Sequence, residues 1–529
     1  MDPELRLSTK PAFGHYQCNV AMRLAKDTGR NPREIAQEIV ADLDLSDLCE
    51  PLEIAGPGFI NIRIRADRLG EAVTSLLDDP HCGITQAESP QQVVVDYSAP
   101  NVAKPMHVGN LRSTIIGDCL VRILRASGHT VIPQNHIGDW GTQFGMLVEQ
   151  ILHEGTDPST LTLDSSVELY KRAQTHFRDD ESFAEAARFR VVALQGGDEQ
   201  TVAIWQTLIE VSKVGFNEAY TRLGVLLTDE DLAGESMYNG MLDSVAQDLE
   251  TLGIAVHDSG ALCVFLDDDE TPLIVRKSDG GYGYSATDLA AIRYRIDVLQ
   301  ADRLIYVVGS PQAHHFRQVF AAATKAGWLP DTVRAEHVGF GSVLGADGKM
   351  FKTRDGKAVT LNTLLDAAEE AATPEVAMAA VKYADLANAL HKDYVFDVDR
   401  MTATTGDTGP YLQYAHARVS QILRRAGAEG DVVVDASAEI NSLTEPAEEF
   451  LALALSRFPQ VVSEVEKGLQ PHKLCIYLFE LATQLSTFYE QCPVLKSEER
   501  LSRLVLCRAT QKVLATGLNL LGIQAPESM

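Results

Sequence analysis

The sequence predicts an α/β protein in three parts. We expect a doubly wound parallel sheet with an inserted helical segment, preceded by an α+β module and followed by an all-α bundle. Three observations predict this. Apolar strand-like runs alternate with amphipathic helices in the middle of the chain, strand alternation and a helical stripe share the first 90 residues, and helical spacing dominates after about residue 360. A length of 529 residues allows roughly three or four domains.

We place the first module at residues 1–90. Asn31-Pro32 is typical of a helix N-cap followed by proline at the first helical position, and apolar residues then recur at helical spacing to residue 43. Between residues 60 and 65 isoleucines alternate with polar residues, which predicts a strand. The turn Gly56-Pro57-Gly58 leads into that strand.

The second domain is expected at residues 91–360. The apolar run at 93–97 is suited to a buried parallel strand, and a polar loop and a long helix at 111–124 follow it. The same rhythm returns with a helix at 289–299 and a strand at 304–308, which completes a Rossmann-like sheet. Amphipathic helix and charged loop near 150–275 indicate an insertion.

We expect a connecting helical segment at 361–400 and a helical bundle at 401–529. Leucines at helical spacing are predicted to face the bundle core: Leu451, Leu455, Leu478, Leu481, Leu485, Leu504 and Leu514.

Composition excludes several classes of protein. No window approaches about 18–20 uncharged apolar residues, so we expect no membrane span. The eight cysteines form no CxxC pair and no Cys/His cluster, which favours reduced thiols, a cytoplasmic location and no structural metal. A net charge of -28 argues against general affinity for nucleic acid but leaves room for a local basic groove.

The loop at 98–110 carries the densest chemistry. It lies between a predicted strand and a helix N-terminus, where free N–H groups and the helix dipole favour a phosphate. Lys104 supplies a charge, His107 and Asn110 supply N–H donors, and Gly109 allows close approach. The alternative is a structural loop with one satisfied histidine and an amide cap.

His107-Val108-Gly109-Asn110, after a loop of the form Pro-Asn-x-x-Lys-Pro, resembles the first signature of class I aminoacyl-tRNA synthetases. Asn110 stands where most relatives carry a second histidine. The wider stretch 95–146 resembles the arginyl-tRNA synthetases specifically. The resemblance continues in order through residues 284–288, 306–316, 341–356, 381–386 and 409–418 and the terminal Met529.

The resemblance implies roles for individual residues. Catalytic roles fall to His107, Asn110, Lys104 and Lys352. ATP contacts fall to His107, Gly109, Asn110, Val338 and Lys352. The arginine pocket is implied to contain Asp96, Asn101, Tyr284, Asp288 and Gln312. Contacts to tRNA are implied for Phe59, Asn61, Tyr411, Tyr414 and Met529, which makes the first module a tRNA-binding domain and the bundle an anticodon-binding domain.

Physical chemistry agrees with the arginine pocket. A guanidinium presents five donors in a rigid fork and requires carboxylate and amide oxygens in fixed places. Tyr284 and Asp288 are four residues apart and share one face if the segment is helical. The alternative for this pair is that Asp288 caps the helix. His314-His315 could suggest a metal site, but no third ligand is evident and a surface or packing role is favoured.

Two registers are possible for the second signature. Lys349-Met350-Phe351-Lys352 superficially resembles the Lys-Met-Ser-Lys loop, but we prefer the register Phe351 to Gly356, in which Thr353 replaces the second lysine. Lys104 is then similar to the lysine thought to compensate in this family. The structural alternative is a solvated turn rich in Lys and Arg.

The aromatic candidates for tRNA also have structural alternatives. Tyr411 and Tyr414 lie on one side of a predicted helix, where exposed rings can stack on unpaired bases. Aromatic stripes more often belong to a bundle core. Phe59 and Asn61 share one face of a predicted strand, but Phe59 can instead pack inward while Asn61 merely faces water.

The resemblance implies an arginine–tRNA ligase that forms arginyl-adenylate. Its substrates would be L-arginine, ATP with Mg²⁺ and tRNA(Arg), and we expect a monomer with no membrane partner. Two alternatives remain open: a diverged duplicate that activates arginine or an analogue for biosynthesis or resistance, and a non-catalytic regulator that binds arginine or tRNA.

Overall fold

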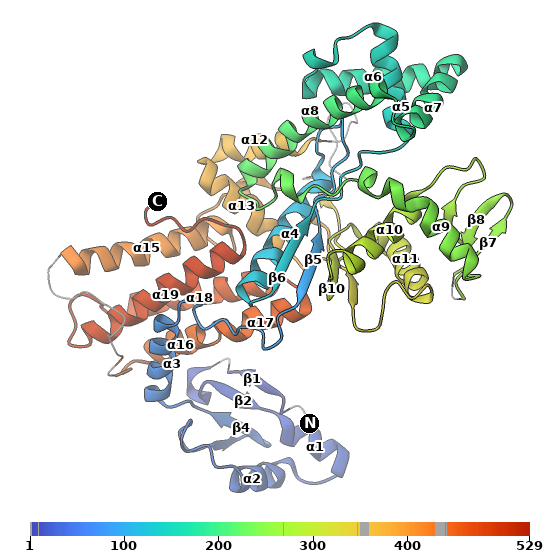
Figure 1. Cartoon of the computed structure of the whole chain (residues 1–529). Coiled ribbons are helices and arrows are strands. Elements are labelled where there is room, and N and C mark those ends of the chain that lie inside the picture. Colours follow the sequence, from blue (N-terminus) through green and yellow to red (C-terminus); the bar gives the residue numbers. More distant parts are fainter. Residues whose placement is uncertain are drawn as a thin grey trace.

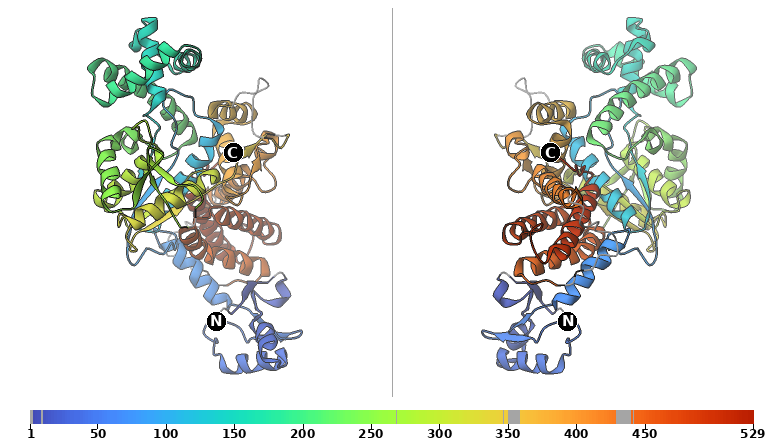
Figure 2. Two further views of the ribbon diagram at one scale, coloured as in Figure 1. Left: turned by 90° about the vertical axis from the view of Figure 1, so that its right-hand side faces the viewer. Right: turned by 90° about the vertical axis from the view of Figure 1, so that its left-hand side faces the viewer.

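The structure, a computed structural model, describes residues 3–8, 10–267, 269–345, 347–349, 359–428, 440 and 442–529. Its N-terminal module and its inserted helices lie at opposite ends of the molecule, with the central sheet and the helical bundle between them (Figures 1 and 2). This arrangement confirms the predicted α/β domain followed by a helical C-terminal region.

The central sheet has four parallel strands in the order β11-β10-β5-β6. They are β5 (Gln92–Asp96), β6 (Thr130–Gln134), β10 (Arg303–Tyr306) and β11 (Arg334–His337). Asp96 pairs with Gln134 on one side and with Tyr306 on the other. The chain leaves β5 toward β6 and later returns on the opposite side of β5, so a topological switch point lies between β5 and β10. Open α/β sheets bind their ligands at such a point.

Helix α4 (Val108–Ala126) follows β5 and is buried along most of its length. It contacts α12, α13, α17 and α19, so it lies between the sheet and the bundle. Residues 110–121 are all buried, so the helix has no exposed face over this stretch. The predicted helix at 111–124 is therefore correct and begins three residues earlier than its apolar stripe.

A second core is formed by α10 (Tyr284–Asp297) and α11 (Ala313–Lys325), and α10 confirms the helix predicted at 289–299. Beside them lies an antiparallel sheet that the sequence analysis did not predict. It consists of β7 (Ala255–Asp258), β8 (Ala261–Val264) and β9 (Leu273–Arg276). Each strand has four residues, and the short apolar runs at 261–266 and 273–275 cannot be told from buried helix by periodicity.

Four helices extend from the sheet at one end of the molecule (Figure 1). They are α5 (Thr142–Glu154), α6 (Leu163–Asp179), α7 (Glu181–Gln195) and α8 (Glu199–Leu223). Helix α8 leads back to the sheet, where the hydroxyl of Tyr220 accepts a hydrogen bond from Asn135 Nδ2 at 2.9 Å, directly after β6. The insertion is thus anchored beside the carboxyl ends of the strands.

The N-terminal module contains a four-stranded sheet in the order β1-β2-β4-β3. The strands are β1 (Leu5–Leu7), β2 (Tyr16–Cys18), β3 (Glu53–Ala55) and β4 (Phe59–Ile62), and the helices are α1 (Val20–Thr28) and α2 (Pro32–Asp42). Asn31 accepts a hydrogen bond from Arg33 N, as the predicted N-cap requires. Helix α3 (Ala66–Asp78) instead packs against the bundle helices α16 and α19.

The C-terminal part is helical, with one short exception. Its main helices are α12 (Leu361–Ala371), α13 (Pro374–Leu386), α15 (Gly409–Ala428), α16 (Pro446–Ser456), α17 (Phe458–Gly468), α18 (His472–Gln491) and α19 (Arg500–Leu520). The seven leucines predicted to face the core are all buried. The exception is a two-residue strand, β13 (Tyr394–Val395), which pairs with β12 (Val343–Leu344).

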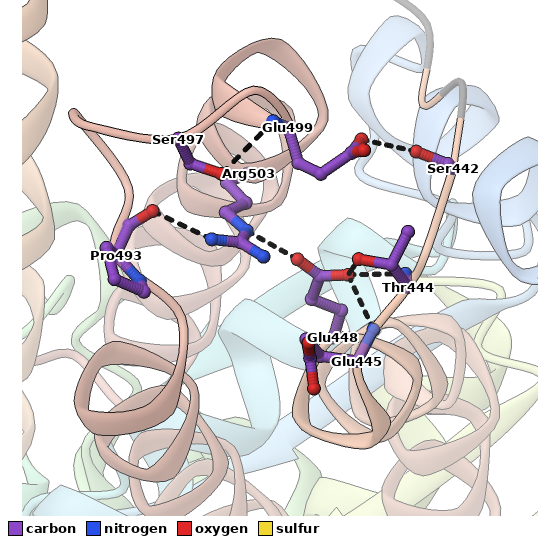
Figure 3. A network of polar contacts seen from close by, with 8 residues as sticks. All are labelled: Ser442, Thr444, Glu445, Glu448, Pro493, Ser497, Glu499 and Arg503. Atoms are coloured by element: carbon purple, nitrogen blue, oxygen red, sulfur yellow. Dashed lines mark hydrogen bonds and ion pairs between the residues drawn. The ribbon is translucent and has the colours of Figure 1, made fainter.

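A buried ion pair joins two bundle helices (Figure 3). Arg503 of α19 donates from Nε to Glu448 Oε1 at 2.5 Å and from Nη1 to the carbonyl of Pro493 at 2.9 Å. The other oxygen of Glu448 accepts from the backbone N–H groups of Thr444 and Glu445. Glu448 therefore both forms an ion pair with Arg503 and caps the start of α16 (Pro446–Ser456).

Another ionic contact joins the N-terminal module to the bundle. His15 Nδ1 accepts a hydrogen bond from Ile64 N, so the proton of the neutral ring lies on Nε2, which donates to Glu449 Oε2 at 3.3 Å. Arg63 Nη1 lies 2.7 Å from the same oxygen. The hydrogen bond from His15 and the charge of Arg63 lower the pKa of Glu449.

Candidate active site

The loop between β5 and α4 lies at the switch point of the sheet. Three of its non-glycine residues have positive φ, a strained conformation that surrounding contacts must hold: Ser98 (74°), Ala99 (46°) and Ala103 (58°). Their backbone N–H groups donate to side chains from three different elements, Ser113 of α4, Asn135 after β6 and Ser212 of α8. Sheet, helix and insertion together fix this loop.

His107 and Asn110 form a capping box at the start of α4. His107 Nδ1 accepts from Gly109 N at 2.9 Å, and the backbone N–H of His107 donates to Asn110 Oδ1 at 3.1 Å. Because Nδ1 is an acceptor, the neutral ring carries its proton on Nε2. Asn110 is buried and also donates from Nδ2 to the carbonyl of Ser98. The predicted amide cap is therefore present, and it leaves the Nε2–H donor of His107 unused by the cap.

Electrostatics keep His107 neutral. Burial, and then the positive charge of Lys104, lower the pKa of the His107 ring. Around neutral pH the ring therefore donates from Nε2 without carrying a charge, while Lys104 supplies the positive charge nearby. A Cβ at Gly109 would lie 2.6 Å from the His107 ring, so only glycine fits between cap and ring.

Carboxylates gather beside this loop, around the start of α10. Asp288 lies one turn into the helix and accepts from His315 Nε2 at 2.6 Å. It makes no cap, so the capping alternative is wrong, and the structure assigns it instead a hydrogen bond with His315. Tyr284, on the same face, is 73% exposed.

Glu235 is the residue that sequence reasoning missed here. It begins the short helix η4 (Glu235–Met241), at the end of the insertion. Burial, followed by the charges of Asp139 and Asp288, raises the pKa of Glu235 to about 8. Burial, followed by the charge of Glu235, raises the pKa of Tyr284. Three carboxyl groups thus influence one small region, which suits a cationic ligand.

Asp139 is fixed by the backbone that carries Glu235. Its carboxylate accepts from the backbone N–H of Ser236 at 2.8 Å and from the Ser236 hydroxyl at 2.5 Å. A Cβ at Gly234 would lie 2.3 Å from Asp139 Oδ2, so glycine is required beside it. The Gly138-Asp139 turn after β6 therefore positions Glu235 relative to Asp288.

Asp96 ends β5 and is engaged by a protein arginine. Arg295 of α10 donates to Asp96 Oδ2 at 2.7 Å and to Gln134 Oε1 at 2.6 Å, and its guanidinium lies 4.9 Å from the Tyr306 ring centroid. Arg295 is almost completely buried. One oxygen of Asp96 is therefore used within the protein, and its proposed substrate contact must come through the other.

The remaining predicted ligands line the same end of the sheet. The side-chain oxygen of Asn101 lies against Gly138, where a Cβ would be 2.5 Å away. Gln312 ends η5 (Ser310–Gln312) and is exposed. Val338 follows β11 and donates its backbone N–H to the carbonyl of Tyr306. Lys352, with the rest of the predicted second signature from Phe351 to Gly356, lies outside the described residues.

The predicted tRNA contacts of the N-terminal module lie on β4. Phe59 is half-buried, and Asn61 is buried and accepts from Gln17 Nε2 at 3.0 Å. Ile60, between them, points to the module core on the other face. The alternative, an inward Phe59 and a water-facing Asn61, is therefore wrong for Asn61.

The predicted contacts in the bundle differ in exposure. Tyr411 of α15 packs on Phe479 with ring centroids 5.7 Å apart, whereas Tyr414 is 46% exposed. Both line a small cavity of about 40 Å³ that Arg418 and Tyr489 complete. Met529 is 54% exposed. Because Tyr411 packs on Phe479 while Tyr414 is exposed, the core alternative fits Tyr411 better than Tyr414.

Among the described residues no three His, Cys, Asp or Glu side chains are arranged to hold a metal ion. No helix in the same residues is long and apolar enough to cross a membrane. The eight cysteines are free thiols.

Comparisons with known proteins agree with this architecture. The sequence matches "Arginyl tRNA synthetase N terminal domain" over residues 1–64, "tRNA synthetases class I (R), catalytic domain" over 72–376 and "DALR anticodon binding domain" over 412–529. An arginine–tRNA ligase of Cutibacterium acnes is 60% identical, with 100% of this chain and 97% of the relative covered. One of Thermobifida fusca is 49% identical over 100% and 95% of the two chains.

Solved structures give the same result. Arginyl-tRNA synthetase of Plasmodium falciparum superposes with a TM-score of 0.84 at 29% identity, covering 100% of this chain and 96% of that one. The Thermus thermophilus arginyl-tRNA synthetase gives 0.81 at 26% identity, covering 99% and 96%. Three matched domains in order and full-length relatives leave one conclusion: the chain belongs to the arginyl-tRNA synthetases, within class I of the aminoacyl-tRNA synthetases.

Proposed function

We propose that the chain ligates L-arginine to tRNA(Arg) at the switch point between β5 and β10, by way of arginyl-adenylate. ATP-dependent ligation of arginine to tRNA is the activity of its family. One observation carries the assignment of the site. The edge of the sheet that holds the neutral His107 donor at a helix N-terminus also holds the carboxylates around Asp288. A phosphate and a guanidinium would find complementary groups side by side.

The first step is adenylate formation. The arginine carboxylate attacks the α-phosphorus of ATP in line, a new O–P bond forms, and the bond to pyrophosphate breaks. His107 Nε2–H and Lys104 stabilise the charge that develops on the phosphate oxygens, and the N-terminus of α4 adds its dipole. Asn110 acts through His107, because its side-chain oxygen accepts from the backbone N–H of His107 and holds that residue in the capping box. Val338 and Lys352 complete the proposed ATP site, and Mg²⁺ enters with ATP as part of the substrate.

Arginine is held by its cationic end. Asp288 and Glu235 supply carboxylate oxygens to the guanidinium, and Tyr284 covers it at the mouth. Asn101, Gln312 and the free oxygen of Asp96 are proposed for the amino acid's remaining polar groups. The buried Arg295 beneath Asp96 orients that carboxylate through the contact between Arg295 Nη2 and Asp96 Oδ2 at 2.7 Å.

The second step transfers arginine to tRNA. The 2′-hydroxyl of the terminal tRNA nucleotide attacks the adenylate carbonyl, and AMP leaves. We propose Phe59 and Asn61 as contacts to the tRNA D-loop and Tyr411, Tyr414 and Met529 as contacts to the anticodon loop. Among Phe59, Tyr411 and Tyr414, the ring of Tyr414 is the most exposed. We further propose that the chain acts as a monomer in the cytoplasm.

The experiment separates chemistry from binding. His107→Ala and Asp288→Asn are compared in tRNA charging and in calorimetric arginine binding. The proposal expects His107→Ala to lower charging by at least about 100-fold with arginine affinity nearly intact. It expects Asp288→Asn to weaken arginine binding itself. Charging that survives His107→Ala would contradict the assigned site, and an unmodified chain that binds arginine without charging tRNA would leave the regulator interpretation.

A further inference from the structure

Lys104 is the charged group of the signature loop, and its surroundings come from the insertion. Its Nζ lies 4.5 Å from the centroid of the Tyr170 ring, above the ring face. Within the part of the chain that the structure describes, Lys104 makes no ion pair with a carboxylate. Its charge is also close enough to His107 to lower the pKa of that ring. The ammonium therefore lies between an aromatic face and the first signature.

Three carboxylates line the same cavity as Lys104, and two of them are paired with other cations, Glu168 with Lys171 and Asp366 with Arg222. Lys104 lines a cavity of about 460 Å³ together with Asp164, Glu168 and Asp366. A lysine has four rotatable side-chain bonds, so its ammonium can reach several positions within such a space. Pairing with one of these carboxylates would neutralise the charge and draw it away from the phosphates. The aromatic face supplies an attractive position that leaves the charge unneutralised.

The insertion is built to bring Tyr170 to this position. Helix α6 crosses α8 at Gly215, where a Cβ would lie 2.6 Å from Leu163 Cδ2. Leu163 and Tyr170 are seven residues apart and share one face of α6. One turn before Gly215, the hydroxyl of Ser212 accepts from the backbone N–H of Ala103 at 2.8 Å. The insertion thus holds the residue before Lys104 through its backbone and Lys104 itself through its side chain.

We propose that Tyr170 is a positioning residue that keeps Lys104 directed toward the ATP phosphates. The proposal rests on the function proposed for Lys104 and adds to it a residue from the insertion, outside the signature. Tyr170 acts through Lys104 and touches no substrate. The face of the Tyr170 ring makes the contact with Lys104, so the Tyr170 hydroxyl is not required.

The test is a set of variants of the full chain in steady-state tRNA charging, with KM measured separately for ATP and arginine. Tyr170→Leu removes the ring, Tyr170→Phe keeps it, and Lys104→Met removes the charge. Phe177→Leu is the matched control, because Phe177 lies on the same helix beneath another cation, Arg188, at 5.5 Å. Circular dichroism checks folding, and Tyr170→Met replaces the leucine variant if that variant does not fold.

Tyr170→Leu is expected to lower kcat/KM for ATP about 5- to 30-fold, the population ratio that a partly buried cation–π contact supports. Tyr170→Phe and Phe177→Leu should remain within about twofold of the unmodified chain, and KM for arginine should not change. In the Lys104→Met background, Tyr170→Leu should have no further effect, because a residue that acts through Lys104 has nothing left to position.

The outcomes separate the two proposals. If Lys104→Met is impaired but Tyr170→Leu is not, the positioning role is refuted and the function of Lys104 stands. If Tyr170→Leu impairs charging equally in the Lys104→Met background, or if Phe177→Leu does the same damage, the effect is a general loss of packing and the inference fails. If Lys104→Met charges normally, the function proposed for Lys104 fails, and the inference fails with it.

Discussion

The protonation of Glu235 makes arginine binding depend on pH. Its pKa is raised to about 8 by burial and then by the charges of Asp139 and Asp288. Without a ligand, Glu235 is therefore mostly neutral at pH 7. A bound guanidinium favours the ionised form, since an opposite charge at hydrogen-bonding distance stabilises the carboxylate. Binding of arginine should then release a proton.

The size of the effect follows from one-site linkage. If only the ionised form binds arginine, the apparent Kd is the intrinsic value multiplied by one plus the ratio of protonated to ionised Glu235. That factor is about 11 at pH 7 and about 2 at pH 8, so affinity should improve about fivefold over this interval. At pH 7 about 0.9 proton should be released for each arginine bound.

Isothermal titration calorimetry measures both quantities, because the proton count follows from the heat in two buffers of different ionisation enthalpy. Glu235→Gln is the control: it should bind arginine more weakly and lose this release. A release below about 0.2 proton at pH 7, or the same pH dependence in Glu235→Gln, would refute the reasoning.

Three further predictions follow from single contacts. Asp288→Asn should raise KM for arginine about 10- to 150-fold, the worth of a charged hydrogen bond, with KM for ATP unchanged in charging kinetics. Tyr414→Ala should weaken tRNA binding by at least about fivefold in a filter-binding assay, because base stacking is lost, while calorimetry shows unaltered arginine affinity. Arg503→Met should lower the unfolding free energy of the bundle by about 3–5 kcal/mol in urea denaturation, because it leaves the buried Glu448 carboxylate without its cationic partner. Adding Glu448→Gln to the same chain should restore part of that free energy.

Local sequence patterns were sufficient for the skeleton of the fold. The apolar run that ends at Asp96 became β5, and the Asn31-Pro32 pair became the start of α2. Both depend on neighbours in the chain, which a sequence displays directly. The antiparallel sheet at 255–276 was not predicted, because strands of four residues with exposed outer positions show no clear alternation of apolar and polar residues.

The site was predictable where a motif is contiguous and not where it depends on distant partners. The resemblance named His107 and Asp288, and the structure places both at the switch point. Neither Arg295, which engages Asp96 from 199 residues away, nor Glu235, which becomes a site residue only because η4 folds back beside Asp139, has a local signal.

The most direct test of the central claim is charging of total tRNA by the purified chain with ATP and each of the twenty amino acids in turn. The account predicts that arginine alone gives stable aminoacyl-tRNA, that an arginine-specific transcript is sufficient as acceptor, and that His107→Ala abolishes the product. Charging with another amino acid, or arginine binding without any charged tRNA, would contradict it.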